Sequence, residues 1–196
     1  MEYRVYAVSD ATEEELALWL TECSEEKRQR LLQMRREDDR RRSLCAEHLA
    51  RQMLSERCGI PRDHLQILRD ERGKPFAKDS GLQFNLSHAG NFVACAVDTA
   101  PVGIDIEVPR PIRPALCRKV CTAEELAFVH PAGSFSPERF LQLWTAKEAF
   151  LKHSGIGILR DLTTVSTVQD GQLTYPAPLK GMFLREPAYF LSIAYT

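Results

Sequence analysis

Hydrophobic and polar residues follow two different repeats along this chain, one typical of strands and one typical of helices. An apolar residue at every second position indicates a strand, because successive side chains point to opposite faces. From this alternation, and from short apolar runs bounded by turn residues, we predict strands at residues 3–8, 65–70, 82–88, 91–98, 102–107, 162–168, 172–176 and 188–195. Gly73 and Pro75 predict a turn between the second and third of these strands, and Asp170–Gly171 predicts a hairpin between the sixth and seventh.

Capping residues mark the starts of the predicted helices, because a side-chain oxygen there can accept a hydrogen bond from an unpaired backbone N–H group. These starts are the capping boxes Thr12–Glu15 and Thr122–Glu125 and the single caps Ser24 and Ser136. The longest predicted helix spans residues 36–58 and ends at Gly59, and a shorter one covers residues 114–120. The last predicted helix spans residues 136–153.

The order of these elements suggests an internal duplication. In each half of the chain, helices are accompanied by a few short strands, and the segment NFVACAV at 91–97 resembles YFLSIAY at 189–195. We therefore predict an α+β fold of two similar halves, residues 1–100 and 101–196, with a boundary near Pro101. In the expected arrangement a pseudo-two-fold axis relates the halves, each half packs a small antiparallel sheet on a long helix, and the active site lies in the cleft between them.

The strand at residues 102–108 has one apolar face and one acidic face. Val102, Ile104 and Ile106 point one way, whereas Asp105 and Glu107 point the other way, about 7 Å apart. Two carboxylates this close repel each other unless a cation or a basic side chain lies between them. A Mg²⁺ ion would resolve the repulsion, because it takes one to three carboxylates and completes its shell with water and phosphate oxygens. The alternative is an ordinary solvated face of an antiparallel sheet.

The helix at residues 136–153 carries charges in its apolar stripe. At 100° per residue, Lys147 falls near the middle of this stripe and Glu148 lies at its edge, with Lys152 one turn later. An unpaired buried charge is costly, so these side chains need partners. One interpretation is an exposed Glu148–Lys152 pair with Lys147 extending its ammonium to solvent. In the other, Glu148 joins the two strand carboxylates as a third metal ligand.

Composition narrows the class of protein. The chain has 196 residues and a formal net charge of -1, which predicts no general attraction to nucleic acid or to a membrane. Its 6 cysteines show no zinc-ligand spacing, so we expect reduced core thiols. The first residues lack a secretory signal pattern, and no apolar run is long enough to cross a bilayer. We therefore expect a cytoplasmic protein. Any binding of anions must involve local groups of basic residues, because the net charge of the chain does not attract them.

Several polar residues of the first half are candidates for such a local site. Ser87 and His88 end a predicted strand, but adjacent strand residues face opposite ways, so they cannot act as a catalytic dyad and His88 is better suited to contact a phosphate. A histidine hydrogen-bonded within the sheet is the alternative. Lys74 lies beside Gly73 in the predicted turn. The basic residues Lys27, Arg30 and Arg40–Arg42 are either a phosphate-binding patch or solvated helix faces.

Four motifs, RGKP, FNLSH, GIDIE and WTAKEAFLK, stand in this order between about Ser24 and about Gly157. Together they resemble the motif set of the phosphopantetheinyl transferases of the surfactin-synthetase-activating type. The family moves the phosphopantetheine arm of coenzyme A onto a carrier-protein serine and leaves adenosine 3′,5′-bisphosphate. The chain departs from the family pattern at Val108 and Ala89, where a basic and a hydroxyl residue are common, and Arg110 stands two places late.

The resemblance implies roles for particular residues. Asp105, Glu107 and Glu148 match the family's magnesium ligands, Glu148 is also the candidate general base, and Lys152 lies near the reacting phosphates. The remaining matches, around the nucleotide and its phosphates, are Lys27, Arg30, Arg42, Ser43, Lys74, Ser87, His88 and Lys147.

The resemblance also implies partners. These are coenzyme A as substrate, Mg²⁺ or Mn²⁺ as cofactor, and an apo acyl or peptidyl carrier protein of fatty-acid, polyketide or nonribosomal-peptide synthesis. We expect a monomer that uses neither nucleic acid nor a membrane. A non-catalytic module that binds coenzyme A or a nucleotide is the main alternative, and a nucleic-acid-binding helix at residues 34–43 is a further one.

Overall fold

The computed structural model describes residues 1–155 and 161–196, so the predicted end of the family resemblance at Gly157 lies outside the described residues. The chain divides into two compact units, Met1–Ala100 and Pro101–Thr196. Both mix helices with small antiparallel sheets, as the sequence predicted. None of the helices in the described ranges has the length and apolar character needed to span a membrane.

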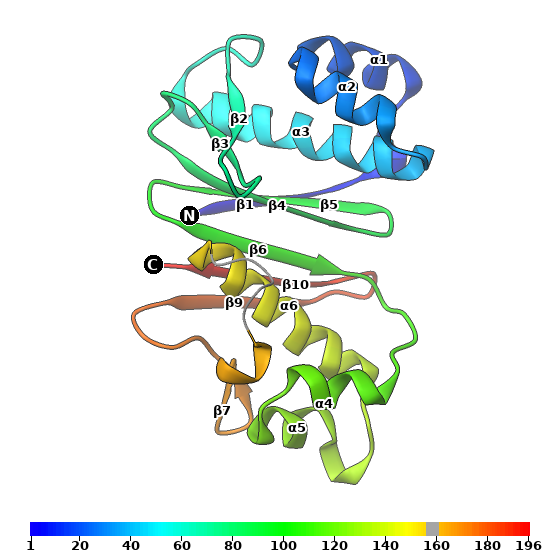
Figure 1. Ribbon diagram of the computed structural model, residues 1–196, viewed down its shortest axis with the longest axis vertical. Helices are drawn as coiled ribbons and strands as arrows, with labels where there is room; N and C mark the ends of the chain where they lie inside the picture. The colour runs from blue at the N-terminus through cyan, green and yellow to red at the C-terminus, as the bar shows by residue number, and fades with distance from the viewer. Residues whose placement is uncertain (156–160) are drawn as a thin grey trace. The chain divides into compact units, whose positions relative to one another are not determined.

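Unit 1 packs one long helix on a three-stranded sheet (Figure 1). The sheet has the order β1-β5-β4 and is antiparallel throughout. Its strands are β1 (Glu2–Ala7), β4 (Gln83–Ala89) and β5 (Phe92–Asp98), and its helices are α1 (Glu13–Glu22), α2 (Glu25–Gln33) and α3 (Glu37–Cys58), with a short 3₁₀ turn at Val8–Asp10. Met53 and Leu54 of α3 are fully buried, as are Val93, Cys95 and Val97 of β5. Burying each of the large aliphatic side chains contributes about 1.5–3 kcal/mol, so this contact is a central part of the core of the unit.

The predicted helix starts are confirmed in both units. Thr12 and Thr122 each form a complete capping box, with glutamates three residues later. Ser24 and Ser136 accept hydrogen bonds from the backbone of α2 and of α6. Gly59 adopts a left-handed conformation (φ 73°) and ends α3 where the sequence predicted it.

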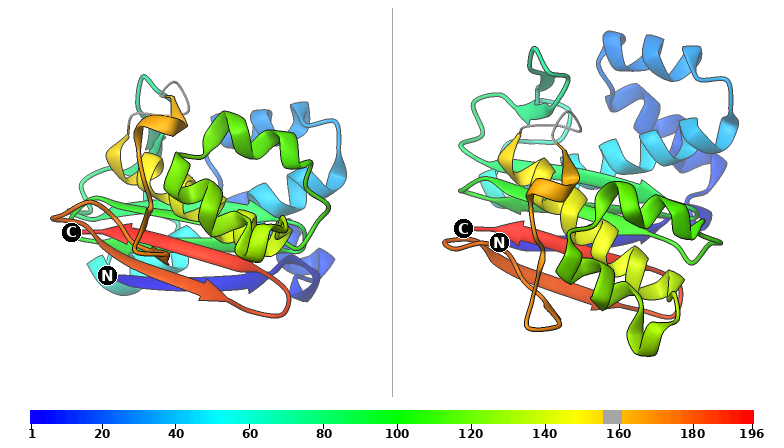
Figure 2. Two further views of the ribbon diagram at one scale, coloured as in Figure 1. Left: turned by 90° about the horizontal axis from the view of Figure 1, so that it is seen from below. Right: turned by 60° about the horizontal axis from the view of Figure 1, so that its bottom comes forward.

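Unit 2 repeats the arrangement of one helix on a three-stranded antiparallel sheet, and Figure 2 shows α6 lying across one face of this sheet. The order is β6-β10-β9. The elements are β6 (Val102–Glu107), α4 (Cys117–Val120), α5 (Ala123–Val129), α6 (Pro137–Ser154), β7 (Val168–Gln169), β8 (Gln172–Leu173), β9 (Lys180–Arg185) and β10 (Phe190–Tyr195), with 3₁₀ turns at Pro114–Leu116, Pro131–Gly133 and Leu162–Thr164. The two segments that resemble each other in sequence become β5 and β10, and each is the central strand of its sheet.

The predicted strands differ from the observed ones at three places, and in addition the predicted strand 172–176 ends at Leu173. The turn at Gly73 joins β2 (Ile67–Arg69) to β3 (Pro75–Ala77), a strand the sequence did not predict, rather than to β4. Residues 162–168 form a 3₁₀ turn followed by a two-residue strand, because the backbone carbonyls of Leu162 and Val165 bind a buried lysine instead of a neighbouring strand. Strand β9 was missed, because Gly181 and the charged ends of LKGMFLR hide its alternation.

The cysteines agree with the prediction of core thiols. All 6 are free and five are buried, Cys58 being the partly exposed one. Burial raises the pKa of the Cys23 and Cys45 thiols to about 11, so both stay protonated at neutral pH.

Candidate active site

Gly103 explains how helix α6 comes to lie on strand β6. A Cβ atom on Gly103 would lie 2.0 Å from the carbonyl oxygen of Ala149 and 2.4 Å from the backbone nitrogen of His153. No side chain other than hydrogen fits there, so the helix backbone rests directly on the strand. Because strand residues alternate, Asp105 and Glu107 share the face of Gly103 that α6 covers. The glycine of GIDIE therefore places the helix over the two carboxylates.

This contact buries the acidic face of β6. Asp105 is 6 % exposed, which rules out the alternative of a solvated face for this residue. Its Oδ1 atom accepts a hydrogen bond from Lys152 Nζ at 2.7 Å, and the same ammonium donates to the carbonyl of Ile104 at 3.1 Å. Lys152 thus forms its ion pair with Asp105, whereas the exposed-pair interpretation expected Glu148 as the partner.

Glu107 lies at the end of the strand and is partly exposed. Both of its carboxylate oxygens accept hydrogen bonds from Arg110, from Nη2 at 3.1 Å and from Nε at 3.3 Å. Arg110 stands two places later than the basic residue common in the family, and its side chain folds back to the strand carboxylate. This position supplies a positive charge beside GIDIE despite the departure in sequence.

Glu148 of α6 completes the acidic group. Burial raises the pKa of its carboxyl group, the negative charge of Asp105 raises it further and Glu107 adds a smaller effect, while Lys152 opposes them. The three carboxylates therefore act on one another electrostatically, and their negative charge exceeds the positive charge of Lys152 and Arg110. Such a group suits either a bound cation or a general base.

The donor set fits a hard divalent cation, because Mg²⁺ and Mn²⁺ prefer carboxylate oxygens. In the described residues, however, no three acidic, histidine or cysteine side chains converge as a ready metal cluster. Two of the three carboxylates are instead engaged in ion pairs, Asp105 with Lys152 and Glu107 with Arg110. Metal binding by the three predicted ligands requires these side chains to rearrange.

Lys147 points away from this group. Its ammonium lies 2.7 Å from Glu125 Oε2 and donates to the carbonyls of Leu162 at 2.7 Å and Val165 at 2.6 Å. Lys147 is 1 % exposed, so the interpretation in which it extends to solvent is wrong.

In unit 1 the structure brings together some of the predicted phosphate contacts. Lys27 is buried and donates from Nζ to Ser43 Oγ at 2.9 Å and to the Ser43 carbonyl at 3.2 Å, with Glu47 at 3.5 Å. Burial lowers the pKa of Lys27, and the positive charges of Arg30 and Arg69 lower it further against the effect of Glu47. Lys27, Arg30 and Arg69 thus form a cationic cluster, which we call the unit 1 cationic cluster.

Arg69 is a residue that sequence reasoning missed. Burial lowers its pKa, and the charge of Arg30 adds to this effect. Its register partner in the β2-β3 hairpin is Pro75, next to the predicted contact Lys74, whose own pKa is lowered by burial. A single arginine in a three-residue strand belongs to no sequence motif. Its position near Lys74 therefore becomes evident only from the β2-β3 hairpin.

The other predicted contacts of unit 1 are more dispersed. Ser87 is buried and His88 is exposed on the opposite face of β4, which confirms that the two cannot form a dyad. Arg42 donates to the Gly90 carbonyl at 3.1 Å and pairs with Asp39. It lines a hollow of about 390 Å³ together with Arg41 of the predicted basic patch, but with none of the other residues that match the family's nucleotide contacts.

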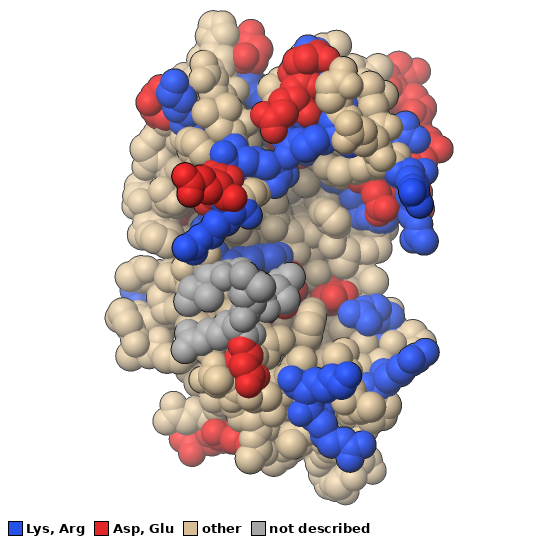
Figure 3. Space-filling model, in the orientation of Figure 1, with Lys and Arg blue, Asp and Glu red and all other residues tan. Residues whose placement is uncertain are grey.

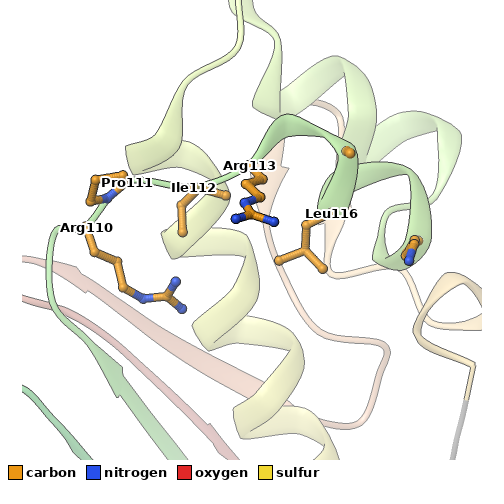
Figure 4. A pocket seen from close by; sticks show the side chains of 7 residues that line it. Arg110, Pro111, Ile112, Arg113 and Leu116 are labelled. Carbon is orange, nitrogen blue, oxygen red and sulfur yellow. The ribbon is translucent and has the colours of Figure 1, made fainter.

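Unit 2 also has a hollow on its surface, formed by the loop after β6 and by α4. This hollow of about 470 Å³ is lined by Arg110, Pro111, Ile112, Arg113, Ala115, Leu116 and Lys119. In the view of Figure 4, the apolar side chains of Ile112 and Leu116 lie on either side of the guanidinium group of Arg113, and the guanidinium group of Arg110 lies on the other side of Ile112. Figure 3 shows Lys and Arg side chains gathered over α4 and the loop before it. We call this feature the basic groove.

Comparisons with known proteins agree with the motifs. Residues 10–100 match a family model described as "4'-phosphopantetheinyl transferase, N-terminal", and residues 101–188 match one described as "4'-phosphopantetheinyl transferase superfamily". The boundary between the two matches coincides with the boundary between the two units.

Among curated proteins, the chain is similar to "4'-phosphopantetheinyl transferase Sfp" of Bacillus subtilis (strain 168), with 29% identity over 180 residues, covering 90% of this chain and 80% of that protein. It is 34% identical over 165 residues to "4'-phosphopantetheinyl transferase psf-1" of Bacillus pumilus, covering 79% of this chain and 71% of that protein. It is also 34% identical over 136 residues to "4'-phosphopantetheinyl transferase gsp" of Aneurinibacillus migulanus, covering 69% of this chain and 57% of that protein. The chain therefore belongs to the 4'-phosphopantetheinyl transferase family, in the type represented by these relatives.

Proposed function

We propose that this enzyme transfers the 4'-phosphopantetheine arm of coenzyme A to a serine of an apo carrier protein and releases adenosine 3′,5′-bisphosphate. The observation that carries the proposal is the meeting of α6 with β6, which places Glu148 within the electrostatic influence of Asp105 and Glu107 and puts Lys152 on Asp105. A phosphoryl-transfer site uses both kinds of group, because carboxylates can bind a metal ion or accept a proton and an ammonium group stabilises the negative charge of the phosphate.

The three carboxylates Asp105, Glu107 and Glu148 would hold Mg²⁺ or Mn²⁺, which supplies charge neutralisation at the pyrophosphate of coenzyme A. Lys152 brings an ammonium to the same group, and we propose that it draws negative charge from the phosphate under attack. Glu148 accepts the proton of the carrier serine as the new P–O bond forms. Its raised pKa suits this task, and such proton transfer commonly contributes about 10²- to 10⁴-fold in rate.

We propose that the unit 1 cationic cluster binds a phosphate group of coenzyme A chiefly through Arg30 and Arg69. Lys27 contributes its positive charge, because its ammonium already faces Ser43 and Glu47. Lys27 and Arg69 both have lowered pKa values, to which the mutual repulsion of the cluster contributes, and a bound phosphate would relieve that repulsion. Lys74, Ser87 and His88 stay candidate contacts of the same ligand. Arg42 lies in a different hollow, so it is the least supported of the predicted contacts.

We further propose that the basic groove docks the carrier protein. Three of its seven lining residues are basic, and Ile112 and Leu116 give it an apolar part. An acidic amphipathic helix is complementary to this surface in both charge and polarity. The pathway that the carrier serves, in fatty-acid, polyketide or nonribosomal-peptide synthesis, then depends on how well its helix fits the groove.

The decisive experiment incubates the purified protein with coenzyme A, Mg²⁺ and a panel of apo carriers from the three pathways, followed by intact mass measurement of each carrier. We expect at least one carrier to gain one phosphopantetheine arm. If no carrier gains mass while coenzyme A still raises the melting temperature of the protein, the chain is a binding module and the transferase proposal fails.

A further inference from the structure

Lys147 belongs to the WTAKEAFLK motif, yet the structure leaves it no proton to offer a ligand. A lysine ammonium carries three N–H donors. In this protein three acceptors surround it, namely Glu125 Oε2 at 2.7 Å and the carbonyls of Leu162 and Val165 at 2.7 and 2.6 Å. The side chain is also sealed from solvent at 1 % exposure. A phosphate of coenzyme A could reach it only by displacing these partners.

Glu125 is equally enclosed and equally satisfied. It is fully buried, and its Oε2 atom also accepts the backbone N–H of Thr122 at 2.7 Å. Its Oε1 atom accepts from the backbone and the hydroxyl of Thr167, at 2.8 and 3.2 Å. The capping-box glutamate of α5 is therefore also the partner of Lys147. A buried ion pair whose other donors and acceptors are also filled is held in one geometry.

The pair joins three parts of unit 2 at one point. Glu125 comes from α5, Lys147 comes from α6, and the accepting and donating backbone groups come from residues 162–167. On other sides α6 is fixed by the Gly103 contact and by the hydrogen bond between Thr145 Oγ1 and Ser192 Oγ at 2.8 Å. The helix is thus anchored against rotation about its own axis.

Rotation of α6 matters because Glu148 follows Lys147 in the helix. Successive residues are about 100° apart around the axis, so holding the Lys147 side chain toward α5 fixes the direction in which the Glu148 carboxylate leaves the helix. A displacement of about 1 Å in a reacting group can lower a rate by about 10²-fold. The pair therefore has a direct geometric connection to the proposed general base.

We propose that Glu125 and Lys147 are positioning residues, a buried ion pair that sets the rotation of α6 and thereby the placement of Glu148, and that Lys147 contacts neither coenzyme A nor the carrier. The proposal rests on the transferase function proposed above and replaces the expectation that Lys147 binds a phosphate. It identifies Glu125, outside the four motifs, as a residue on which the transfer rate depends.

A double-mutant cycle tests the proposal with Lys147→Met, Glu125→Gln and the double variant, all close in size to the native side chains. Each single variant leaves one buried charge without its partner, whereas the double variant removes both charges. We expect kcat to fall about 10- to 100-fold in each single variant, with the KM for coenzyme A within about twofold of wild type. Adding Lys147→Met to Glu125→Gln should change kcat by less than about twofold, because the pair acts as a unit.

Lys152→Met is the matched control, since it removes a lysine of the same helix that faces the acidic group instead of the buried pair. Made in the Glu125→Gln background, it should lower kcat further, because Lys152 does not belong to the pair, whereas Lys147→Met in that background should not. Calorimetry of coenzyme A binding provides a readout that does not need turnover. We expect the Kd to be unchanged by Lys147→Met and raised by Lys152→Met.

Three results would overturn the proposal. One is a Kd or KM for coenzyme A raised tenfold or more by Lys147→Met in both backgrounds, which indicates direct contact. Another is a lower melting temperature with kcat per folded molecule unchanged, which indicates a purely structural pair. The third is additive losses of kcat in the double variant. If a single variant fails to fold, the double variant and the calorimetry still decide, and failure of the wild type to transfer would concern the proposed function alone.

Discussion

Replacing Gly103 by alanine adds a single methyl group at the point where α6 rests on β6. The new Cβ atom would lie 2.0 Å from the Ala149 carbonyl oxygen and 2.4 Å from the His153 nitrogen. Both are backbone atoms of the helix, so neither can turn aside as a flexible side chain could. The strand and the helix must separate locally.

The size of this separation follows from the contact distance. A carbon atom and a carbonyl oxygen normally stay about 3.3 Å apart or more, so the helix must move by about 1.3 Å. Overpacking of this kind costs about 1–3 kcal/mol of stability. Because Glu148 and Lys152 move with the helix while Asp105 stays on the strand, we expect kcat/KM to fall by about 10²-fold or more.

The assay measures the rate of carrier modification by intact mass and the stability by urea unfolding, for the wild type and the variant. Gly181→Ala is the matched control, because Gly181 lies in β9 of the same sheet and its Cβ atom would meet mainly the ring edges of Phe183 and Tyr175, at 2.5–2.9 Å. These side chains can shift, so activity should be largely retained. A Gly103→Ala variant with wild-type kcat/KM would refute the claim that direct backbone contact at this glycine places the catalytic side chains.

Four further predictions address other parts of the molecule. Burial lowers the pKa of His48 to about 4, whereas the unfolded chain binds this proton near pH 6.5, so the free energy of unfolding should fall as the pH drops from about 6.5 to about 4. The loss should be no more than about 2 kcal/mol for this partly exposed ring, and His48→Phe should reduce this pH dependence in urea unfolding curves. Arg69→Gln should raise the KM for coenzyme A about tenfold with little change in kcat, and an unchanged KM would remove Arg69 from the phosphate site. Charge reversal at Arg113 and Lys119 should raise the KM for the carrier and leave the Kd for coenzyme A unchanged in calorimetry, whereas equal effects on both would argue against carrier docking in the basic groove. Chelation by EDTA should abolish transfer and added Mg²⁺ or Mn²⁺ should restore it, while full activity in EDTA would contradict the proposed role of the three carboxylates.

Local signals in the sequence predicted local structure well. The capping boxes at Thr12 and Thr122, the caps Ser24 and Ser136 and the helix end at Gly59 depend on hydrogen bonds within a few residues, so the residue types nearby were sufficient. The short strands of the β2-β3 hairpin and of β9 were predicted less well. Each of these strands pairs with the next strand in the chain. However, the three-residue strands β2 and β3 are too short to show a clear alternation, and the consecutive apolar residues Met182, Phe183 and Leu184 hide it in β9.

The candidate site divides in the same way. Alternation along β6 placed Asp105 and Glu107 on one face, and helical periodicity placed Lys147 and Glu148 in adjacent directions. Neither the strand alternation nor the helical periodicity predicts which charged side chains form ion pairs. Lys152 pairs with Asp105, and Lys147 pairs with Glu125 from another helix.

The sequence by itself determined the family, the positions of the helices and the acidic face of β6, because motifs, caps and alternation are properties of neighbouring residues. Only the tertiary structure decided which charges meet, since residues 42 or 47 positions apart in the chain, such as Thr167 and Glu125 or Lys152 and Asp105, come within hydrogen-bonding distance by packing of whole elements. The pairing of buried charges depends on the distance between them and on their desolvation, and neither quantity can be predicted from the order of residues along the chain.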